Sequence, residues 1–263
     1  MLPVPTAAVL AAAVLAVAGL LAAALVGCAA PSAAEQLRVQ VQDTLPHDTT
    51  MSTQGLEISG GVLYESSGLV GQSRVRATAL SSAVLLREAT LPAPLFGEGL
   101  TVAGDRLWQL TYTSGLAIER DPATLTERRR VTYQGEGWGL CNNGDRLVMS
   151  NGSERLTFRD PVTFAPSGQV VVRLDGEPVR RLNELECADG VIWANVFQDE
   201  RILRIDPGTG TVTGVVDGSG LLSPPPQSNA DVLNGIAAIP GTDEFLVTGK
   251  NWPSLFRVRF VPA

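Results

Sequence analysis

The chain is poor in the side chains that most catalytic and metal sites use. Its 263 residues include one histidine, His47, and three cysteines, Cys28, Cys141 and Cys187. That is too few for a zinc site of the usual kind. A Ser-His-Asp or Cys-His mechanism would have to use His47, which stands in a turn-like Pro46-His47-Asp48 stretch. We therefore do not expect a zinc enzyme, and we expect no cofactor.

Long basic runs are also missing. The net charge is -7, and the longest run of Lys or Arg is Arg128-Arg129-Arg130. Nucleic-acid binding proteins concentrate positive charge on one surface, so nucleic acid is not an expected partner. The diffuse acidic character indicates solubility.

The N-terminus has the composition of a targeting segment. Ala7 to Val26 is almost entirely Ala, Val and Leu, as in the apolar region of a signal peptide or a membrane span. It ends Leu25-Val26-Gly27-Cys28, which resembles the lipobox of bacterial lipoproteins. We expect 1–28 to be a signal peptide with Cys28 as the lipid attachment point, 29–35 to be a tether, and the protein to be lipid-anchored on the outer face of the bacterial cytoplasmic membrane. Met1 to Thr6 has no Lys or Arg, which leaves open a plain cleaved signal or an uncleaved anchor.

The rest of the chain repeats with a period of roughly 40 to 50 residues, which is the period of propeller blades. In the first four repeats, an aliphatic residue is followed seven positions later by another, with a Gly-, Asn- or Asp-rich turn between them. The five repeats open at Gln54-Gly55-Leu56, Glu98-Gly99-Leu100, Trp138-Gly139-Leu140, Asn183-Glu184-Leu185 and Asn234-Gly235-Ile236.

Further strands follow in each repeat. A third, alternating strand is clear at 156–160, 202–206 and 255–260, and fourth strands at 170–173 and 211–215. The fifth repeat ends at Ala263 without a fourth strand, whereas 37–42 is a strand without a repeat. We predict an all-β fold, a five-bladed β-propeller over 36–263 that this N-terminal strand closes. An open β-sandwich or a β-helix is the alternative.

Residues that open the innermost strands of a propeller lie near one mouth of its channel. Here they are polar or indole side chains where apolar ones would be usual, which favours a shared pocket. Singly, each also suits a turn, a cap or the core. Glu98, between Gly97 and Gly99, is the candidate acid/base group. Further candidates on the second strands and their exits are Glu65, Gln109, Tyr112, Trp193, Asn195, Phe197, Lys250 and Trp252.

These residues carry a family resemblance over essentially everything from about residue 36 onward. The chain resembles the glutamine cyclotransferase family, the plant and bacterial type of glutaminyl-peptide cyclotransferase. The matching stretches, in order, are Pro46-His47-Asp48, Thr53-Gln54-Gly55-Leu56, Tyr64-Glu65-Ser66, Gly71-Gln72-Ser73, Phe96-Gly97-Glu98-Gly99-Leu100-Thr101, Leu107-Trp108-Gln109-Leu110-Thr111, Gly137-Trp138-Gly139-Leu140, Leu182-Asn183-Glu184-Leu185-Glu186, Trp193-Ala194-Asn195-Val196, Leu233-Asn234-Gly235-Ile236 and Thr248-Gly249-Lys250-Asn251-Trp252-Pro253.

The resemblance implies a five-bladed propeller that cyclises N-terminal glutamine to pyroglutamate without a metal. It implies that Glu98 is the catalytic carboxylate and that Gln54, Phe96, Trp138, Asn183 and Lys250 bind the substrate. To these we add Gln109, Tyr112, Phe197 and Asn234 as substrate-binding candidates. Three positions depart from the family pattern: Ser52 replaces the usual Phe, and Tyr112 and Phe197 replace the usual Trp. The loss of a ring at Ser52 predicts a thinner apolar wall.

Other interpretations remain open from the sequence. A calcium-dependent propeller hydrolase, similar to a lactonase, would use Glu98, Asn183 and Asn234 as metal ligands. A non-catalytic surface propeller is a third possibility. We expect a monomer whose substrate is free glutamine or the N-terminal glutamine of a peptide or protein. A disulfide between Cys141 and Cys187, in equivalent turns of neighbouring blades, is permitted in an exported protein but not required.

Overall fold

The computed structural model describes Met1, residues 33–222 and residues 231–263, which form strands, turns and loops but no helix. The predicted signal segment and Cys28 lie outside the described residues. No helix in the described part of the chain could span a membrane.

The strands group into the five blades of a propeller, numbered here from the one that opens at Thr53. Blade 1 consists of β2 (Thr53–Ser59), β3 (Val62–Ser67), β4 (Arg74–Ala79) and β5 (Leu85–Thr90). Blade 2 consists of β6 (Gly97–Ala103), β7 (Arg106–Thr111), β8 (Leu116–Arg120) and β9 (Glu127–Thr132). Blade 3 consists of β10 (Leu140–Asn142), β11 (Leu147–Met149), β12 (Arg155–Arg159) and β13 (Pro166–Val171). Blade 4 consists of β16 (Leu182–Ala188), β17 (Val191–Val196), β18 (Arg201–Ile205) and β19 (Val212–Asp217).

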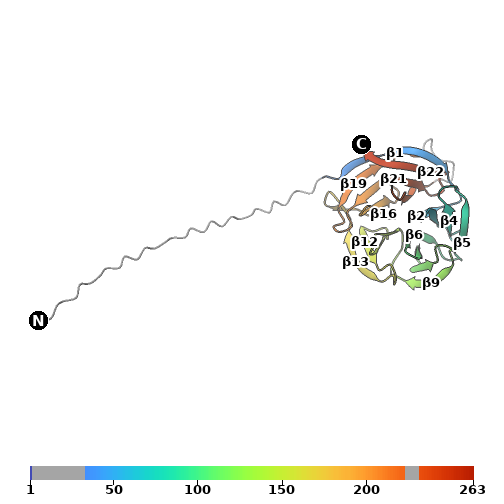
Figure 1. The fold of residues 1–263 in the computed structure, drawn as a ribbon, viewed down its shortest axis with the longest axis horizontal. Helices are drawn as coiled ribbons and strands as arrows, with labels where there is room; N and C mark the ends of the chain where they lie inside the picture. Colours follow the sequence, from blue (N-terminus) through green and yellow to red (C-terminus); the bar gives the residue numbers. More distant parts are fainter. Residues whose placement is uncertain (2–32, 223–230) are drawn as a thin grey trace. The chain divides into compact units, whose positions relative to one another are not determined.

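Blade 5 combines the two ends of the described chain, as predicted. Strands β20 (Leu233–Ala238), β21 (Glu244–Gly249) and β22 (Ser254–Pro262) are completed by β1 (Glu35–Pro46), which pairs antiparallel with β22 (Figure 1). Strand β1 is longer than the predicted 37–42, and its first residues, Glu35 to Arg38, also pair in parallel with β19 of blade 4. Blades 4 and 5 therefore form one sheet of eight strands, and no sheet edge is left open between them.

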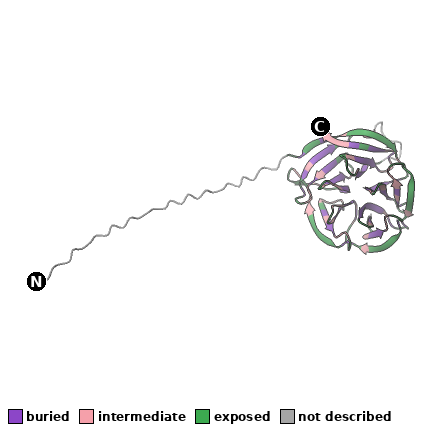
Figure 2. Ribbon diagram, in the orientation of Figure 1, coloured by how far each residue is buried: buried purple, intermediate pink, exposed green. Residues whose placement is uncertain are grey.

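Burial falls from the inside of each blade to the outside. All residues of the innermost strand β6 are buried, whereas the outermost strands β5 and β9 are mostly exposed (Figure 2). The apolar side chains form clusters between neighbouring blades, as in the group of Leu100, Val102 and Tyr64 from blades 1 and 2. This packing holds the five innermost strands around one axis, where their first residues meet.

An Asp-Pro pair follows the third strand in each of blades 2, 3 and 4. Asp121, Asp160 and Asp206 each accept backbone N–H groups two and three residues later through Oδ1. Such turns satisfy the backbone at the point where the third strand of a blade reverses into the fourth.

Cys141 and Cys187 are joined by a disulfide, with their Cα atoms 5.4 Å apart. They lie in the innermost strands β10 and β16 and not in turns, so the predicted location was wrong although the pairing was permitted. The bridge links blades 3 and 4.

Glu184, a candidate for the channel mouth, instead connects blades from inside the channel. It is fully buried, and its two carboxyl oxygens accept the N–H groups of Leu56 in blade 1, at 3.2 Å, and Ile236 in blade 5, at 2.8 Å. Burial raises the pKa of Glu184 well above its usual range. The pKa of Glu186 is raised by its burial and by the charge of Glu57.

We expect Glu184→Ala to lower the free energy of unfolding by about 4 kcal/mol, because two buried N–H groups lose their acceptor. Glu184→Gln keeps one acceptor oxygen and should cost about half as much. Urea unfolding of the two variants measures the difference. Equal, small losses for both would contradict the role of Glu184 as a double acceptor.

Candidate active site

A cavity of about 200 Å³ lies at the channel mouth, and all five blades contribute to its wall. This is below the roughly 300–1,000 Å³ of sites for drug-sized ligands, and it suits a single amino-acid side chain. Eight of the ten residues predicted from the sequence line it: Gln54, Phe96, Glu98, Tyr112, Trp138, Asn183, Phe197 and Lys250.

Two glycines let this wall form. A Cβ atom on Gly99 would lie 2.6 Å from the Trp138 carbonyl oxygen, to which the Gly99 N–H donates at 2.7 Å. A Cβ atom on Gly68 would overlap the ring of Phe96. Glycine is therefore required where blade 2 meets blade 3 and where blade 1 meets the Phe96 ring.

Glu98 lies in β6 and is 6 % exposed. Burial raises the pKa of Glu98 well above its usual range; the positive charge of Lys250 opposes this rise, and the negative charge of Glu136 adds to it. Burial therefore outweighs the lysine in setting the pKa of this carboxyl group. A carboxyl group with a raised pKa can both accept and donate a proton near neutral pH.

Glu136 lies beside this cavity without lining it, and it was not among the residues predicted from the sequence. Its Oε2 accepts the Trp138 indole N–H at 2.9 Å, and its charge raises the pKa of Tyr112, which burial raises most. The sequence does contain a signal for Glu136, because Gly135-Glu136-Gly137 repeats the glycine-flanked pattern of Gly97-Glu98-Gly99.

Four aromatic rings follow one another around the cavity. The ring centroids of Phe96 and Tyr112 are 5.8 Å apart, those of Tyr112 and Trp138 6.4 Å, and those of Trp138 and Phe197 5.6 Å. The Lys250 ammonium lies 5.2 Å from the Phe197 ring centroid. Burial lowers the pKa of Lys250, against the charges of Glu98 and Asp231. The four rings thus form an apolar wall, and the Lys250 ammonium lies next to the last of them, Phe197.

Two carboxamides supply the remaining polar groups. Gln54 and Asn183 are each 2 % exposed, and Gln54 Oε1 has no hydrogen-bond partner among the described residues. An unpaired buried amide is costly, and a polar ligand in the cavity would satisfy it.

The sequence and fold comparisons agree on one family. The glutamine cyclotransferase family model matches residues 11–260. The chain belongs to the glutamine cyclotransferase family. It is 36% identical over 230 residues to a glutaminyl-peptide cyclotransferase of Arabidopsis thaliana, a match that covers 86% of this chain and 72% of that protein. Its fold matches the crystal structure of a glutaminyl cyclase from Myxococcus xanthus with a TM-score of 0.81 and 42% identity, over 88% of this chain and 99% of that chain.

Two predicted substrate-binding residues lie outside the cavity wall of this cyclotransferase. Gln109 is fully buried in β7, where its Nε2 donates to Ser66 Oγ and its Oε1 accepts from Arg120. Asn234, also fully buried, donates through Nδ2 to the Thr53 carbonyl oxygen at 2.9 Å. Gln109 thus joins blade 2 to blade 1, and Asn234 joins blade 5 to blade 1.

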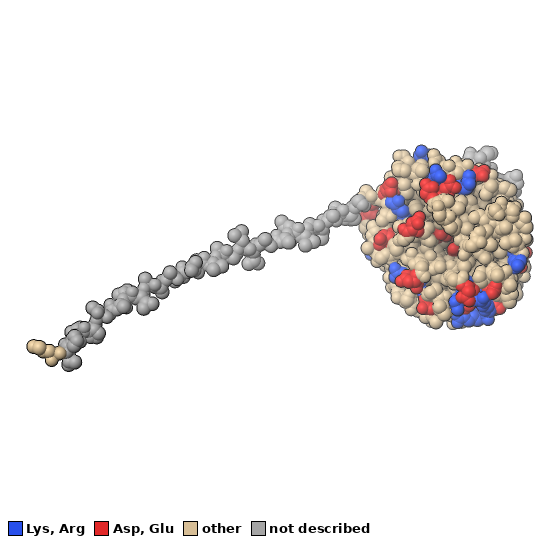
Figure 3. Space-filling view, in the orientation of Figure 1, with Lys and Arg blue, Asp and Glu red and all other residues tan. Residues whose placement is uncertain are grey.

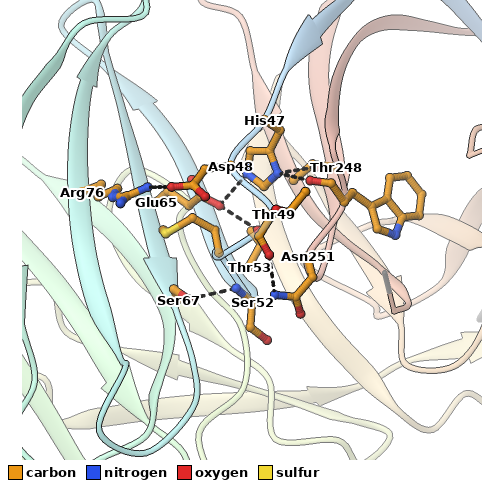
Figure 4. A network of polar contacts seen from close by, with 12 residues as sticks. His47, Asp48, Thr49, Ser52, Thr53, Glu65, Ser67, Arg76, Thr248 and Asn251 are labelled. Carbon is orange, nitrogen blue, oxygen red and sulfur yellow. Dashed lines mark hydrogen bonds and ion pairs between the residues drawn. The ribbon is translucent and has the colours of Figure 1, made fainter. Parts of the chain in front are cut away.

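Ser52, the departure from the family pattern that predicts a thinner wall, is buried and is not part of the cavity lining. Its N–H donates to Ser67 Oγ (Figure 4). Its carbonyl accepts the N–H of Gly68. Tyr112 and Phe197, the other departures, do line the cavity and keep a ring there.

His47 holds together the two segments that carry Gln54 and Lys250. Its Nδ1 lies 2.8 Å from the Trp252 carbonyl oxygen and its Nε2 2.9 Å from Glu65 Oε1, which also accepts the Thr53 hydroxyl (Figure 4). Carbonyl and carboxylate oxygens both accept, so the geometry suits an imidazolium that donates from both nitrogens. Burial lowers the pKa of His47, but the hydrogen bond and charge of Glu65 and the Trp252 carbonyl raise it overall.

A His47→Gln substitution should destabilise the fold by about 3 kcal/mol below about pH 6.5, because Glu65 loses its buried cation. A raised folded-state pKa makes the contribution of His47 complete below the unfolded pKa, and this contribution is lost as the pH rises through the folded pKa. The difference in unfolding free energy between wild type and variant should therefore shrink with increasing pH in urea titrations. A difference that is constant with pH would show that the charge of His47 is not involved.

Among the described residues, no group of three or more His, Cys, Asp or Glu side chains is arranged to hold a metal ion. The lactonase alternative would bring Glu98, Asn183 and Asn234 around one ion, but Asn234 does not line the cavity that Glu98 and Asn183 line. The family match supports a glutaminyl-peptide cyclotransferase instead of a lactonase-like hydrolase.

Proposed function

We propose that this chain converts N-terminal glutamine into pyroglutamate with release of ammonia, and that Glu98 moves the proton. The family and the named activity of the Arabidopsis relative support the reaction. The observation that carries the assignment of Glu98 is its position: a buried carboxyl group of raised pKa in a cavity of side-chain size.

The chemistry is an intramolecular acyl transfer. The α-amine nitrogen of the substrate attacks its own side-chain carboxamide carbon, a five-membered ring forms, and the bond from that carbon to the amide nitrogen breaks. The attacking nitrogen loses one proton and the leaving nitrogen gains one. Glu98 accepts the first proton as a base and returns it as an acid, so the carboxyl group ends as it began.

The other lining residues hold the glutamine folded for this attack. Gln54, Asn183 and Lys250 are donors for the oxygen that becomes negative in the tetrahedral intermediate. Phe96, Tyr112, Trp138 and Phe197 pack on the substrate methylenes and exclude water, which favours attack by the amine over hydrolysis.

Mass spectrometry of a glutamine-initiated peptide after incubation with the protein tests the reaction. Loss of one ammonia, and no product from the matching asparagine-initiated peptide, is the expected result. A glutamyl peptide would identify a hydrolase, and an unchanged peptide would identify a binding module; either would refute the proposed activity.

The location and assembly state belong to the same proposal. The lipobox-like Leu25-Val26-Gly27-Cys28 supports export and lipid anchoring through Cys28, with the propeller acting as a monomer outside the cytoplasmic membrane. We expect Cys28→Ser to abolish lipidation. The protein should then either leave the membrane fraction or accumulate as the uncleaved precursor. Unchanged membrane association and processing would contradict lipidation.

A further inference from the structure

A second cavity of about 380 Å³ borders the first one on blade 4. One wall is the short hairpin of β14 (Arg173–Leu174) and β15 (Glu177–Pro178), and the other is the turn that follows β17. Its lining includes Arg180, Arg181, Phe197 and Gln198. The cyclisation as proposed uses none of its residues except Phe197.

Phe197 lines both cavities, so they share a wall. The backbone fixes Arg181 at this wall: its carbonyl accepts the Phe197 N–H at 2.8 Å, and its N–H donates to the carbonyl of Gly152 at 2.8 Å. Gly152 in turn packs directly under the Trp138 ring. Arg181 therefore stands at the rim between two of the aromatic residues of the catalytic cavity, two residues before Asn183.

The backbone on both sides of the shared wall is unusual. Arg181 has a φ of 66° and Gln198 a φ of 60°, in the left-handed region that residues other than glycine seldom adopt. Such conformations persist where the surrounding structure enforces them, and they occur often at binding sites. Here the hydrogen bonds to Gly152 and Phe197 enforce the one at Arg181.

The charge of this second cavity differs from that of the protein as a whole. The chain has a net charge of -7, and the face in Figure 3 shows basic side chains beside acidic ones without a large basic area. The second cavity has three arginines against Glu177 and Asp199. Arg201 pairs with Asp199 at 2.6 Å and Arg180 with Glu154 at 3.4 Å, whereas Arg181 has no acidic partner within 4 Å among the described residues.

We propose that this second cavity is a subsite for the residues that follow the N-terminal glutamine, and that Arg181 makes it select an acidic side chain there. The inference rests on the proposed function, because the glutamine must occupy the first cavity. A peptide that leaves this cavity over Phe197 enters the second one directly. An acidic side chain of this peptide then meets Arg181, the arginine of the second cavity that has no acidic partner within 4 Å among the described residues.

Substrate pairs isolate this contact. The substrates are the amidated dipeptides Gln-Glu, Gln-Gln and Gln-Lys, the amidated tripeptides Gln-Ala-Glu and Gln-Ala-Lys, and glutaminamide, which ends before the subsite. Wild type should show the highest kcat/KM with a Glu-containing peptide, at the second or the third position, and the preference should weaken as salt is added.

Arg181→Gln should lower the ratio of kcat/KM for the preferred Glu peptide over its Lys counterpart by about fivefold, the size of an exposed ion pair, and leave glutaminamide unchanged. Arg181→Glu should reverse the preference. Arg87→Gln is the matched control: it removes the same charge from the exposed strand β5, where Arg87 has no acidic partner within 4 Å among the described residues, and should alter nothing.

The outcomes separate the two proposals. Cyclisation of glutaminamide by wild type with no preference for Glu, or the same preference in Arg181→Gln as in wild type, would overturn the subsite. A wild-type protein that cyclises none of these substrates, neither the peptides nor glutaminamide, would instead overturn the proposed function.

Discussion

Glu98→Gln is expected to leave the propeller folded and to lower kcat/KM for a glutamine-initiated peptide by at least about 10³-fold. The amide is nearly the same size as the carboxyl group and fits the same buried place, but it cannot carry the proton between the two nitrogens. Ammonia release in a continuous assay gives the rate, and urea unfolding shows whether the fold is kept.

The neighbouring Glu136 offers a matched control. Glu136→Gln makes the same chemical change next to the cavity, since the residue is not part of the lining, and an amide oxygen can still accept the Trp138 indole N–H. This variant should retain most of the turnover. Near wild-type activity in Glu98→Gln, or an equal loss in both variants, would show that Glu98 is not the proton-transfer group.

Lys250→Met is expected to lower kcat/KM by about 10²-fold, the usual cost of losing one donor to a developing oxyanion. The substitution also removes the positive charge that opposes the rise of the Glu98 pKa. Lys250→Arg keeps the charge and a donor, so it should recover part of the loss. If methionine and arginine gave the same rate as lysine, the ammonium would have no role in the reaction.

The role of Lys250 can also be tested by chemical modification. Lys250 is the only lysine in the sequence, so an acetylating reagent has one side-chain amine to modify. Acetylation should inactivate the protein, and glutaminamide in the cavity should slow both modification and inactivation. Peptide mass spectrometry identifies the modified residue.

The fold was predictable because each blade repeats one local pattern. The seven-residue offset between aliphatic positions, with a tight turn between them, places two strands of every blade, and the surplus strand before Thr53 indicates how the ring closes. The parallel pairing of β1 with β19 was not predictable, because nothing local to Glu35–Arg38 shows which neighbouring edge they reach.

The sequence predicts which residues lie at the site better than it predicts what each of them does. Positions that open the innermost strands must meet at the channel mouth, so Gln54, Glu98, Trp138 and Asn183 could be found from their register. Register does not show which way a buried amide points, and Asn234 turns to the Thr53 carbonyl instead of the cavity. The role of Glu184 could not be predicted for the same reason. The two N–H groups that it accepts are more than 50 residues away in sequence.

Electrostatic balance was the least predictable property. A lysine and a second carboxylate act on Glu98 in opposite directions, and burial exceeds both, which only the packed structure shows. The same is true of His47: burial lowers its pKa, and the partners that raise it most, Glu65 and the Trp252 carbonyl, come from two other segments.

The acid limb of the pH profile of kcat/KM, measured with glutaminamide for wild type, Glu136→Gln and Lys250→Met, tests the role of Glu98 most directly. With one substrate throughout, a shift between variants reports the enzyme group that must be ionised. Removal of the Glu136 charge should lower the pKa of Glu98 and move the limb to lower pH, and removal of the Lys250 charge should raise that pKa and move the limb to higher pH. The same limb in all three proteins would contradict the assignment of Glu98 as the base.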